Sequence, residues 1–217
     1  MRHGSDNVVY SNFFLDGAGL RIKEGQNQMI YNNYFETGNQ FAIWLVNHNA
    51  DPLDNIVIAY NTFVNSGEIR LGGEGNFPPQ RVVLANNLLH FPNNSFLSDL
   101  TGNEIFANNA VEGSAKYSNY KGFMGLNSYL TKNESGYFQP GIVDCKGFRV
   151  KNGLDLNILD VPGLDDDPNI VLDIMNQDRL KNKGNNCYGC SILNGEKNVH
   201  PYATQENTGP TYLKSHK

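Results

Sequence analysis

Five short segments of the chain repeat one pattern, in which β-branched, apolar or aromatic residues lead to an asparagine and further apolar residues follow. The segments are NVVYSNFF (7–14), NQMIYNNYF (27–35), NIVIAYNTF (55–63), RVVLANNLL (81–89) and NEIFANNAV (103–111). Their closing asparagines are Asn12, Asn33, Asn61, Asn87 and Asn109, separated by steps of 21, 28, 26 and 22 residues. A repeat in this range, with the extra residues confined to loops, predicts a solenoid.

The strand pattern indicates which solenoid to expect. Each run is too short for a helix, and its apolar residues alternate with a period of two. Equivalent positions hold Val9, Ile30, Ile58, Leu84 and Phe106, which we predict to stack inside as one apolar column. The sequence therefore predicts an all-β fold, a single-stranded parallel β-helix, and the general rule for parallel crossovers makes it right-handed.

The repeated asparagines have a physical role in such a stack. Asparagine tolerates left-handed backbone angles better than other non-glycine residues, so it suits the sharp turn after each run. One amide per coil can also hydrogen-bond to the amides of neighbouring coils. We therefore predict a ladder of asparagine side chains along the axis.

The 217 residues correspond to one domain, 1–217, whose regular coils occupy 1–112. Residues 113–139 are rich in Ser, Tyr and Asn and predict an irregular or inserted segment, and 140–217 predict C-terminal coils and a tail. Met1 is followed at once by a repeat in progress, with no signal peptide and no capping element. The expectation is an N-terminally truncated solenoid.

Charge and hydropathy narrow the choice of partners. The net charge is −5, so no global field draws in a polyanion and a nucleic-acid partner is not expected. No apolar stretch approaches the length of a transmembrane helix, so we expect no membrane partner.

Three cysteines are present: Cys145, Cys187 and Cys190. Cys187-Tyr-Gly-Cys190 has the spacing of a redox motif or of half a zinc site, but a second pair is missing. The sequence favours a structural or incidental pair, with a local disulfide as one form of it, over a metal site.

A second strand column lies between the asparagine-closing runs, in GLRIKEG (19–25), AIWLVNHN (42–49) and EIRLGGEG (68–75). Alternation predicts that three apolar pairs point inward: Leu20 and Ile22, Ile43 and Leu45, and Ile69 and Leu71. The residues between them, Arg21, Trp44 and Arg70, then point outward.

Arg2 lies 19 residues before Arg21, about one coil, and we place it in the same outward column. Arg2, Arg21, Trp44 and Arg70 would then line roughly 15 Å of one face. Guanidinium groups bind carboxylates or sulfates bidentately, and an indole face can stack on a sugar ring. The column predicts a binding face for an extended anionic ligand, with plain solubilising charge as the alternative.

Several segments, taken in order, resemble polysaccharide lyase family six, the alginate lyase and chondroitinase B family. Arg2-His3-Gly4, NVVYSNFF, GLRIKEG and NQMIYNNYF resemble its central catalytic coils, and NTFVN (61–65), EIRLGGEG and PPQRVVLANN (78–87) continue the match. DIMNQDR (173–179) and NVHPYATQENTGPTYL (198–213) resemble its C-terminal coil and tail. The resemblance covers most of the chain and implies the pectin lyase-like β-helix of a secreted or periplasmic protein.

The resemblance also implies a function, a calcium-assisted β-elimination on a polyuronate such as alginate (poly-mannuronate). Calcium on the C5 carboxylate would stabilise the developing charge, and a lysine would act as the base at C5. Carried over by position, Arg2 matches the catalytic arginine that assists the leaving oxygen. His3 matches a neighbouring groove histidine and Arg21 a substrate-binding arginine, while the outward column adds Trp44 and Arg70 to the binding residues.

The sequence departs from the family at the base and at the calcium ligands, which in the family lie before the arginine that Arg2 matches. Lys23 and Glu24 have suitable chemistry but fall on a different coil. The chain alone is therefore expected to have little lyase activity. Alternatives are a chondroitin or dermatan sulfate lyase, a non-catalytic β-helix that binds anionic polysaccharide, and a solenoid without a ligand.

Overall fold

The computed structural model describes residues 1–48, 53–72, 77–90, 95–112, 117, 119–126, 172–174 and 188–190. These residues form parallel strands and no helix. The first two coils hold β1 (Val8–Tyr10), β2 (Phe13–Leu15), β3 (Leu20–Lys23), β4 (Gln26–Tyr31), β5 (Tyr34–Glu36) and β6 (Ile43–Val46). The next two hold β7 (Asp54–Ala59), β8 (Thr62–Val64), β9 (Ile69–Arg70), β10 (Gln80–Ala85), β11 (Leu88–His90) and β12 (Leu97–Ser98). They are followed by β13 (Glu104–Ala107), β14 (Asn109–Glu112) and β15 (Phe123–Leu126).

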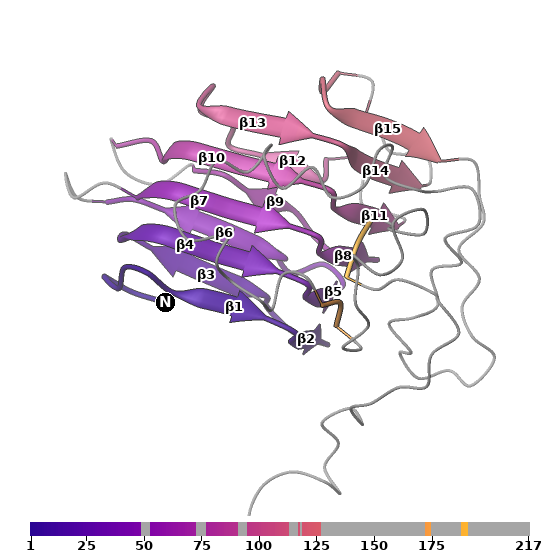
Figure 1. Ribbon diagram of the computed structural model, residues 1–217, viewed down its shortest axis with the longest axis horizontal. Helices are drawn as coiled ribbons and strands as arrows, with labels where there is room; N and C mark the ends of the chain where they lie inside the picture. The colour runs from indigo at the N-terminus through magenta and orange to yellow at the C-terminus, as the bar shows by residue number, and fades with distance from the viewer. Residues whose placement is uncertain are drawn as a thin grey trace, which may run out of the picture.

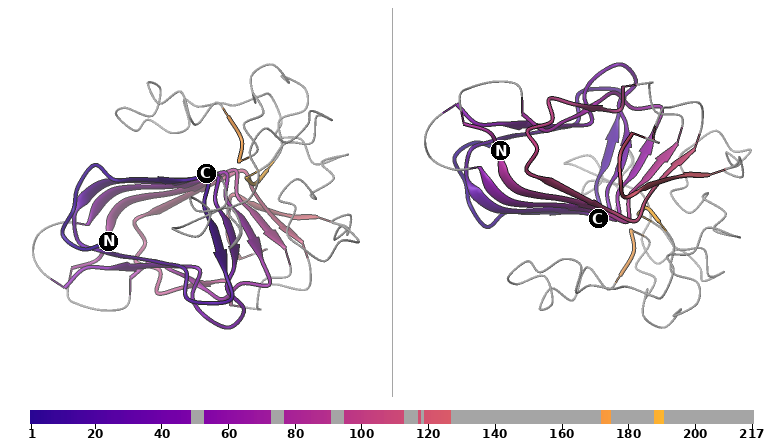
Figure 2. Two further views of the ribbon diagram at one scale, coloured as in Figure 1. Left: turned by 90° about the horizontal axis from the view of Figure 1, so that it is seen from below. Right: turned by 90° about the horizontal axis from the view of Figure 1, so that it is seen from above.

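Each of the first four coils contributes one strand to each of three sheets (Figure 1). Sheet 1 has the order β1-β4-β7-β10-β13, sheet 2 the order β2-β5-β8-β11-β14-β15, and sheet 3 the order β3-β6-β9-β12. Figure 2 looks along the stack and shows the three sheets around a common interior. The predicted all-β parallel β-helix is confirmed. Within the described residues, no helix is long and apolar enough to span a membrane.

The predicted apolar column lies in register inside sheet 1. Val9 pairs with Ile30, Ile30 with Ile58, Ile58 with Leu84, and Leu84 with Phe106. The three central members are fully buried, and the two outer ones pack half-buried against the same core. Burial of a large apolar side chain contributes roughly 1.5–3 kcal/mol, so this column is a main source of stability.

The asparagine ladder is confirmed, with one correction about the turn. The Nδ2 of each closing asparagine donates to the Oδ1 of the next: Asn12 to Asn33 at 3.0 Å, Asn33 to Asn61 at 3.0 Å, Asn61 to Asn87 at 3.1 Å and Asn87 to Asn109 at 2.9 Å. The left-handed residue of each turn is the one before the asparagine: Ser11, Asn32, Tyr60, Asn86 and Asn108, with φ between 51° and 56°. The asparagines are therefore selected for their amides and not for their backbone angles.

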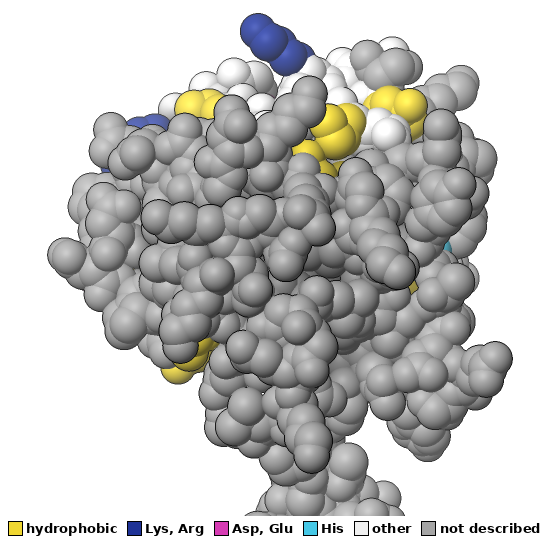
Figure 3. Space-filling view, turned by 45° about the vertical axis from the view of Figure 1, so that its right-hand side comes forward, with side chains coloured by type: hydrophobic (Ala, Val, Ile, Leu, Met, Phe, Trp, Pro, Cys, Tyr) yellow, Lys and Arg dark blue, Asp and Glu magenta, His cyan; other side chains and the backbone are white. Residues whose placement is uncertain are grey.

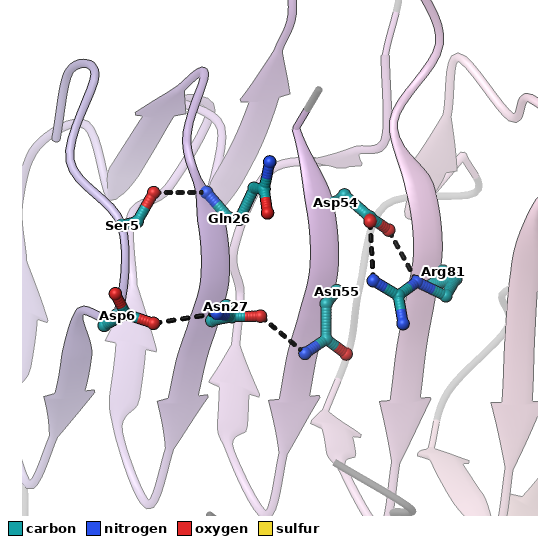
Figure 4. Close-up of polar contacts among 7 residues, drawn as sticks. All are labelled: Ser5, Asp6, Gln26, Asn27, Asp54, Asn55 and Arg81. Atoms are coloured by element: carbon teal, nitrogen blue, oxygen red, sulfur yellow. Dashed lines mark hydrogen bonds and ion pairs between the residues drawn. The ribbon is translucent and has the colours of Figure 1, made fainter. Parts of the chain in front are cut away.

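A second polar ladder marks the corner that leads into sheet 1 (Figure 4). Asn27 donates to Asp6 at 2.8 Å, and Asn55 donates to Asn27 at 2.8 Å. One coil further, Arg81 holds Asp54 through two hydrogen bonds of 2.7 and 2.6 Å. The guanidinium lowers the pKa of the Asp54 carboxyl below its ordinary value, chiefly through these hydrogen bonds.

Two short later segments, residues 172–174 and 188–190, pack against the outer face of sheet 2 through Ile174 and Cys190. The backbone N of Cys190 donates to Oγ1 of Thr62 at 2.9 Å, and that of Gly189 donates to the carbonyl of Asn86 at 2.9 Å. Gly189 has φ +82°, and a Cβ there would lie 2.4 Å from Thr62 Oγ1. Tyr188-Gly189-Cys190 is thus buried against sheet 2. Cys187 lies outside the described residues, so the interpretation of the cysteine pair stays a prediction.

The remaining predictions for 113–217 fall mostly outside the described residues, Cys145 and Cys187 among them. Within 113–139, β15 pairs in parallel with β14 and extends sheet 2 by one strand. Apolar side chains are exposed at the β13–β15 end of the stack (Figure 3), and Ile105 and Met124 are 57% and 40% exposed.

Candidate functional site

The outer face of sheet 3 brings two arginines onto one tryptophan. Arg21 pairs with Trp44 across β3 and β6, and Trp44 pairs with Arg70 across β6 and β9. The guanidinium carbons lie 4.3 and 4.5 Å from the centroid of the indole ring. The predicted outward column of Arg21, Trp44 and Arg70 is therefore present, and its inward neighbours line the core as expected.

The role predicted for Trp44 is wrong in one respect. Consecutive strands of a parallel sheet place one neighbour above and one below each side chain. Here both neighbours are arginines, so both faces of the indole are covered and neither can stack on a sugar. The ring centroids of Trp44 and Phe41 lie 5.3 Å apart with the ring planes at 66°, and Nε1 donates to the carbonyl of Gly72 at 3.3 Å. Trp44 therefore holds two guanidinium groups in fixed positions through cation–π contacts.

Arg70, the arginine on β9, also forms an ion pair. Arg70 Nε donates to Oδ2 of Asp99 at 2.9 Å, and Nη2 lies 2.9 Å from the same oxygen. Both side chains are about one-third exposed. Part of the positive charge at this end of the face is thus compensated.

Arg2 does not lie in this column, which corrects the sequence-based placement. It forms a parallel bridge with Lys23, two residues beyond Arg21. The backbone N of Lys23 donates to the carbonyl of Met1 at 2.9 Å, and the N of His3 donates to the carbonyl of Lys23 at 2.9 Å. The reason is the length of the coil: this first step is 21 residues, as between Asn12 and Asn33, and not 19.

Two rows of cations result from this register. Side chains two residues apart on a strand share a face, so Arg2 and Lys23 form one row beside the row of Arg21, Trp44 and Arg70. Within the described part of the chain, neither Arg2 nor Lys23 has an ion-pair partner. This arrangement can bind an anionic chain that runs along the stack.

A residue pair missed by the sequence prediction lies at the end of these rows. His3 Nδ1 contacts Oε2 of Glu24, whose side chain is 1% exposed. Glu24 follows His3 by 21 residues, the length of the first coil step. A coil of 21 residues would have predicted the contact between His3 and Glu24, but the sequence-based placement of Arg2 took the first coil as about 19 residues.

Among the described residues, no three His, Cys, Asp or Glu side chains come together to hold a metal ion. The calcium implied by the sequence resemblance stays a prediction.

Comparison with known proteins gives a match in structure. No family model and no curated protein matches the sequence. A solved structure of the PL6 family alginate lyase AlyGC matches with a TM-score of 0.55 and 24% identity, covering 63% of this chain. The chain has the β-helix fold of a PL6 family alginate lyase.

A mutant form of AlyGC matches in the same way, with a TM-score of 0.54 and 23% identity over 62% of this chain. In both cases the match covers 22% of the lyase, so this chain corresponds to only part of the length of AlyGC. Both structures belong to the family that the sequence motifs resemble. The structural matches therefore agree with the fold that the sequence resemblance implies.

Proposed function

We propose that this chain forms the arginine-bearing coils of a polysaccharide lyase that acts on an anionic uronate polysaccharide, with alginate as the first choice. The observation that carries the proposal is the pair of cationic rows on sheet 3. Strands repeat about every 4.8 Å along the stack, so Arg2 and Lys23 lie about one strand spacing apart, and Arg21 and Arg70 about two. A polyuronate presents one carboxylate per sugar and can meet such a row repeatedly.

Each residue of the face has a proposed part in binding. Arg21 and Arg70 bind carboxylates of the substrate, and the forked guanidinium geometry suits bidentate contacts. Trp44 keeps these two groups at fixed positions, which reduces the entropy lost when the ligand binds. His3 contributes a polar contact beside Arg2.

Arg2 is proposed to act at the bond that breaks. β-Elimination transfers the C5 proton to a base and expels the oxygen at C4, which takes a proton from solvent, leaving a 4,5-unsaturated uronate. Arg2 stabilises the negative charge that develops on the leaving oxygen, because a guanidinium stays protonated and donates hydrogen bonds without giving up its proton. The described residues supply no calcium cluster, and we assign no base among them.

Two other functions have specific support from the same face. A chondroitin or dermatan sulfate lyase would use the guanidinium rows for sulfate as well as carboxylate. A non-catalytic β-helix would use them for binding alone. The resemblance to polysaccharide lyase family six also leads us to propose a secreted or periplasmic location.

The test combines retention with turnover. The purified 217-residue chain is passed over immobilised alginate, and soluble alginate with calcium is monitored for the ultraviolet absorbance of an unsaturated uronate. Retention without turnover is the expected result. Retention on dermatan sulfate in preference to alginate would favour the sulfated substrate, and no retention on either would contradict the proposal. Steady turnover that Arg2→Ala abolishes would show that the chain carries a complete site.

A further inference from the structure

The turn after β3 brings a buried carboxylate against the histidine beside Arg2. His3 is 55% exposed, whereas Glu24, which it contacts through Nδ1, is 1% exposed. Apart from this contact, neither carboxylate oxygen of Glu24 has a hydrogen-bond partner among the residues that the structure describes. A buried carboxylate is tolerated only when it is paired, and here the imidazole of His3 is the group that pairs it.

The backbone fixes the two residues relative to each other. Both have left-handed angles, with φ of 54° for His3 and 61° for Glu24. The glycines that follow them stack closely, and a Cβ on Gly25 would lie 2.0 Å from the carbonyl oxygen of Gly4. The buried Gln28 donates to that same carbonyl at 2.6 Å. The contact is thus part of a rigid corner.

We propose that Glu24 is a positioning residue for His3. Glu24 accepts the hydrogen of Nδ1, which fixes the tautomer and the orientation of the ring, as carboxylates do for histidines that bind metals. The other nitrogen, Nε2, then faces solvent at the end of the cationic rows, beside Arg2. There it makes a polar contact with the polyuronate, accepting a hydrogen from a sugar hydroxyl when the ring is neutral. This inference rests on the proposed function, because it assigns the ligand of Nε2.

A purely structural ion pair would also bury Glu24 against His3. The two explanations differ in their consequences for ligand binding. If Glu24 only stabilises the turn, removing its acceptor oxygen lowers stability and leaves the affinity of the folded protein unchanged. If Glu24 orients His3, removing its acceptor oxygen changes both the tautomer of His3 and the affinity for the ligand.

Two variants of the full chain separate these cases. Glu24→Met is unbranched and of similar length but has no acceptor, whereas Glu24→Gln keeps an acceptor oxygen. Glu104→Gln is the matched control, because Glu104 accepts from Thr101 in a turn before β13, far along the stack. The tautomer of His3 is read from nitrogen-15 spectra of the imidazole, and affinity is measured by titration with an oligomannuronate. Circular dichroism confirms that each variant is folded.

The expected result is the Nδ1–H tautomer in the wild type and in Glu24→Gln, and its loss in Glu24→Met. Loss of one oriented hydrogen bond should weaken oligomannuronate binding by roughly two- to tenfold in Glu24→Met. Glu24→Gln and Glu104→Gln should stay within about twofold of the wild type.

Two outcomes overturn the inference while the proposed function stands. One is the Nε2–H tautomer of His3 in the wild type, a measurement that requires no variant. The other is unchanged affinity in a folded Glu24→Met. If the wild type itself does not bind oligomannuronate or polymeric alginate, the proposed function fails, and the contact assigned to Nε2 fails with it.

Discussion

The guanidinium of Arg21 lies over the Trp44 ring, with its central carbon 4.3 Å from the ring centroid, and Arg70 lies over the opposite face at 4.5 Å. Each contact contributes roughly 0.5–1 kcal/mol at an exposed site. Their larger effect is on position, because long arginine side chains otherwise sample many rotamers. The tryptophan therefore acts as a spacer between two charges and not as a platform for the ligand.

Replacing this spacer should affect both arginines. Trp44→Leu keeps an apolar residue on β6 but removes the ring, so we expect weaker alginate binding by roughly three- to tenfold. Titration with oligomannuronate at fixed salt measures the effect. Phe41→Leu, which removes only the ring at the edge of Trp44, is the matched control and should bind nearly as well as the wild type. Equal affinities for Trp44→Leu and wild type would contradict the spacer role.

Binding on sheet 3 should depend on Arg21 and on salt. Arg21→Ala removes a cation from the row, so the variant should elute from immobilised alginate at lower salt than the wild type. Arg81→Ala is the control, because Arg81 is equally a surface arginine but lies at the sheet 1 corner on Asp54. If the two variants elute together, the cations of sheet 3 have no special role.

The asparagine ladder should be strongest at its centre. Asn61 is fully buried; its Nδ2 donates to Ile30 O at 2.9 Å and to Asn87, and its Oδ1 accepts from Asn33. Asn61→Ala leaves several buried groups without partners, so unfolding free energy should fall by roughly 2–5 kcal/mol. Asn12→Ala, at the exposed first rung, should cost about 1 kcal/mol or less. Urea unfolding compares them, and equal losses would show that the ladder does not depend on burial.

The Asp54–Arg81 pair gives a pH-dependent prediction. The pKa of Asp54 is lowered from its ordinary value of 3.8, so its stabilising effect is present above that pH and is lost as pH falls through the lower, folded-state value. The urea midpoint of Asp54→Asn should be below that of the wild type near neutral pH, and the gap should close under acidic conditions. The gap should be small, because the Arg81 side chain of the pair is 65% exposed. A gap that widens on acidification would contradict the assignment.

Much of the fold could be predicted from the spacing of a few residues. The spacing of the closing asparagines predicts the length of each coil. The alternation within the runs predicts which residues, from Val9 to Phe106, form the inward column. These features are local, because successive side chains of a strand point to opposite faces, so a few neighbouring residues define which of them points inward. The motifs that resemble polysaccharide lyase family six are likewise contiguous in the chain, so the resemblance does not depend on the tertiary structure.

The candidate site depends on which residues of successive coils lie side by side, and the sequence predicts this register only in part. Arg21, Trp44 and Arg70 were assigned to one column from their strand patterns, but the closure of both Trp44 faces required two neighbours stacked in space. Arg2 was placed two residues away from its true partner, because loops of different lengths make one coil 21 residues and another 28.

The sequence by itself therefore determined the repeat, the inward column and the amide ladder, because each of them is written in residues close together in the chain. Tertiary structure alone decided that Lys23 stands beside Arg2 and that Glu24 is buried against His3. The physical reason is that backbone hydrogen bonds between successive coils set the register. A shift of two residues in that register keeps every side chain on its face but changes which charges meet.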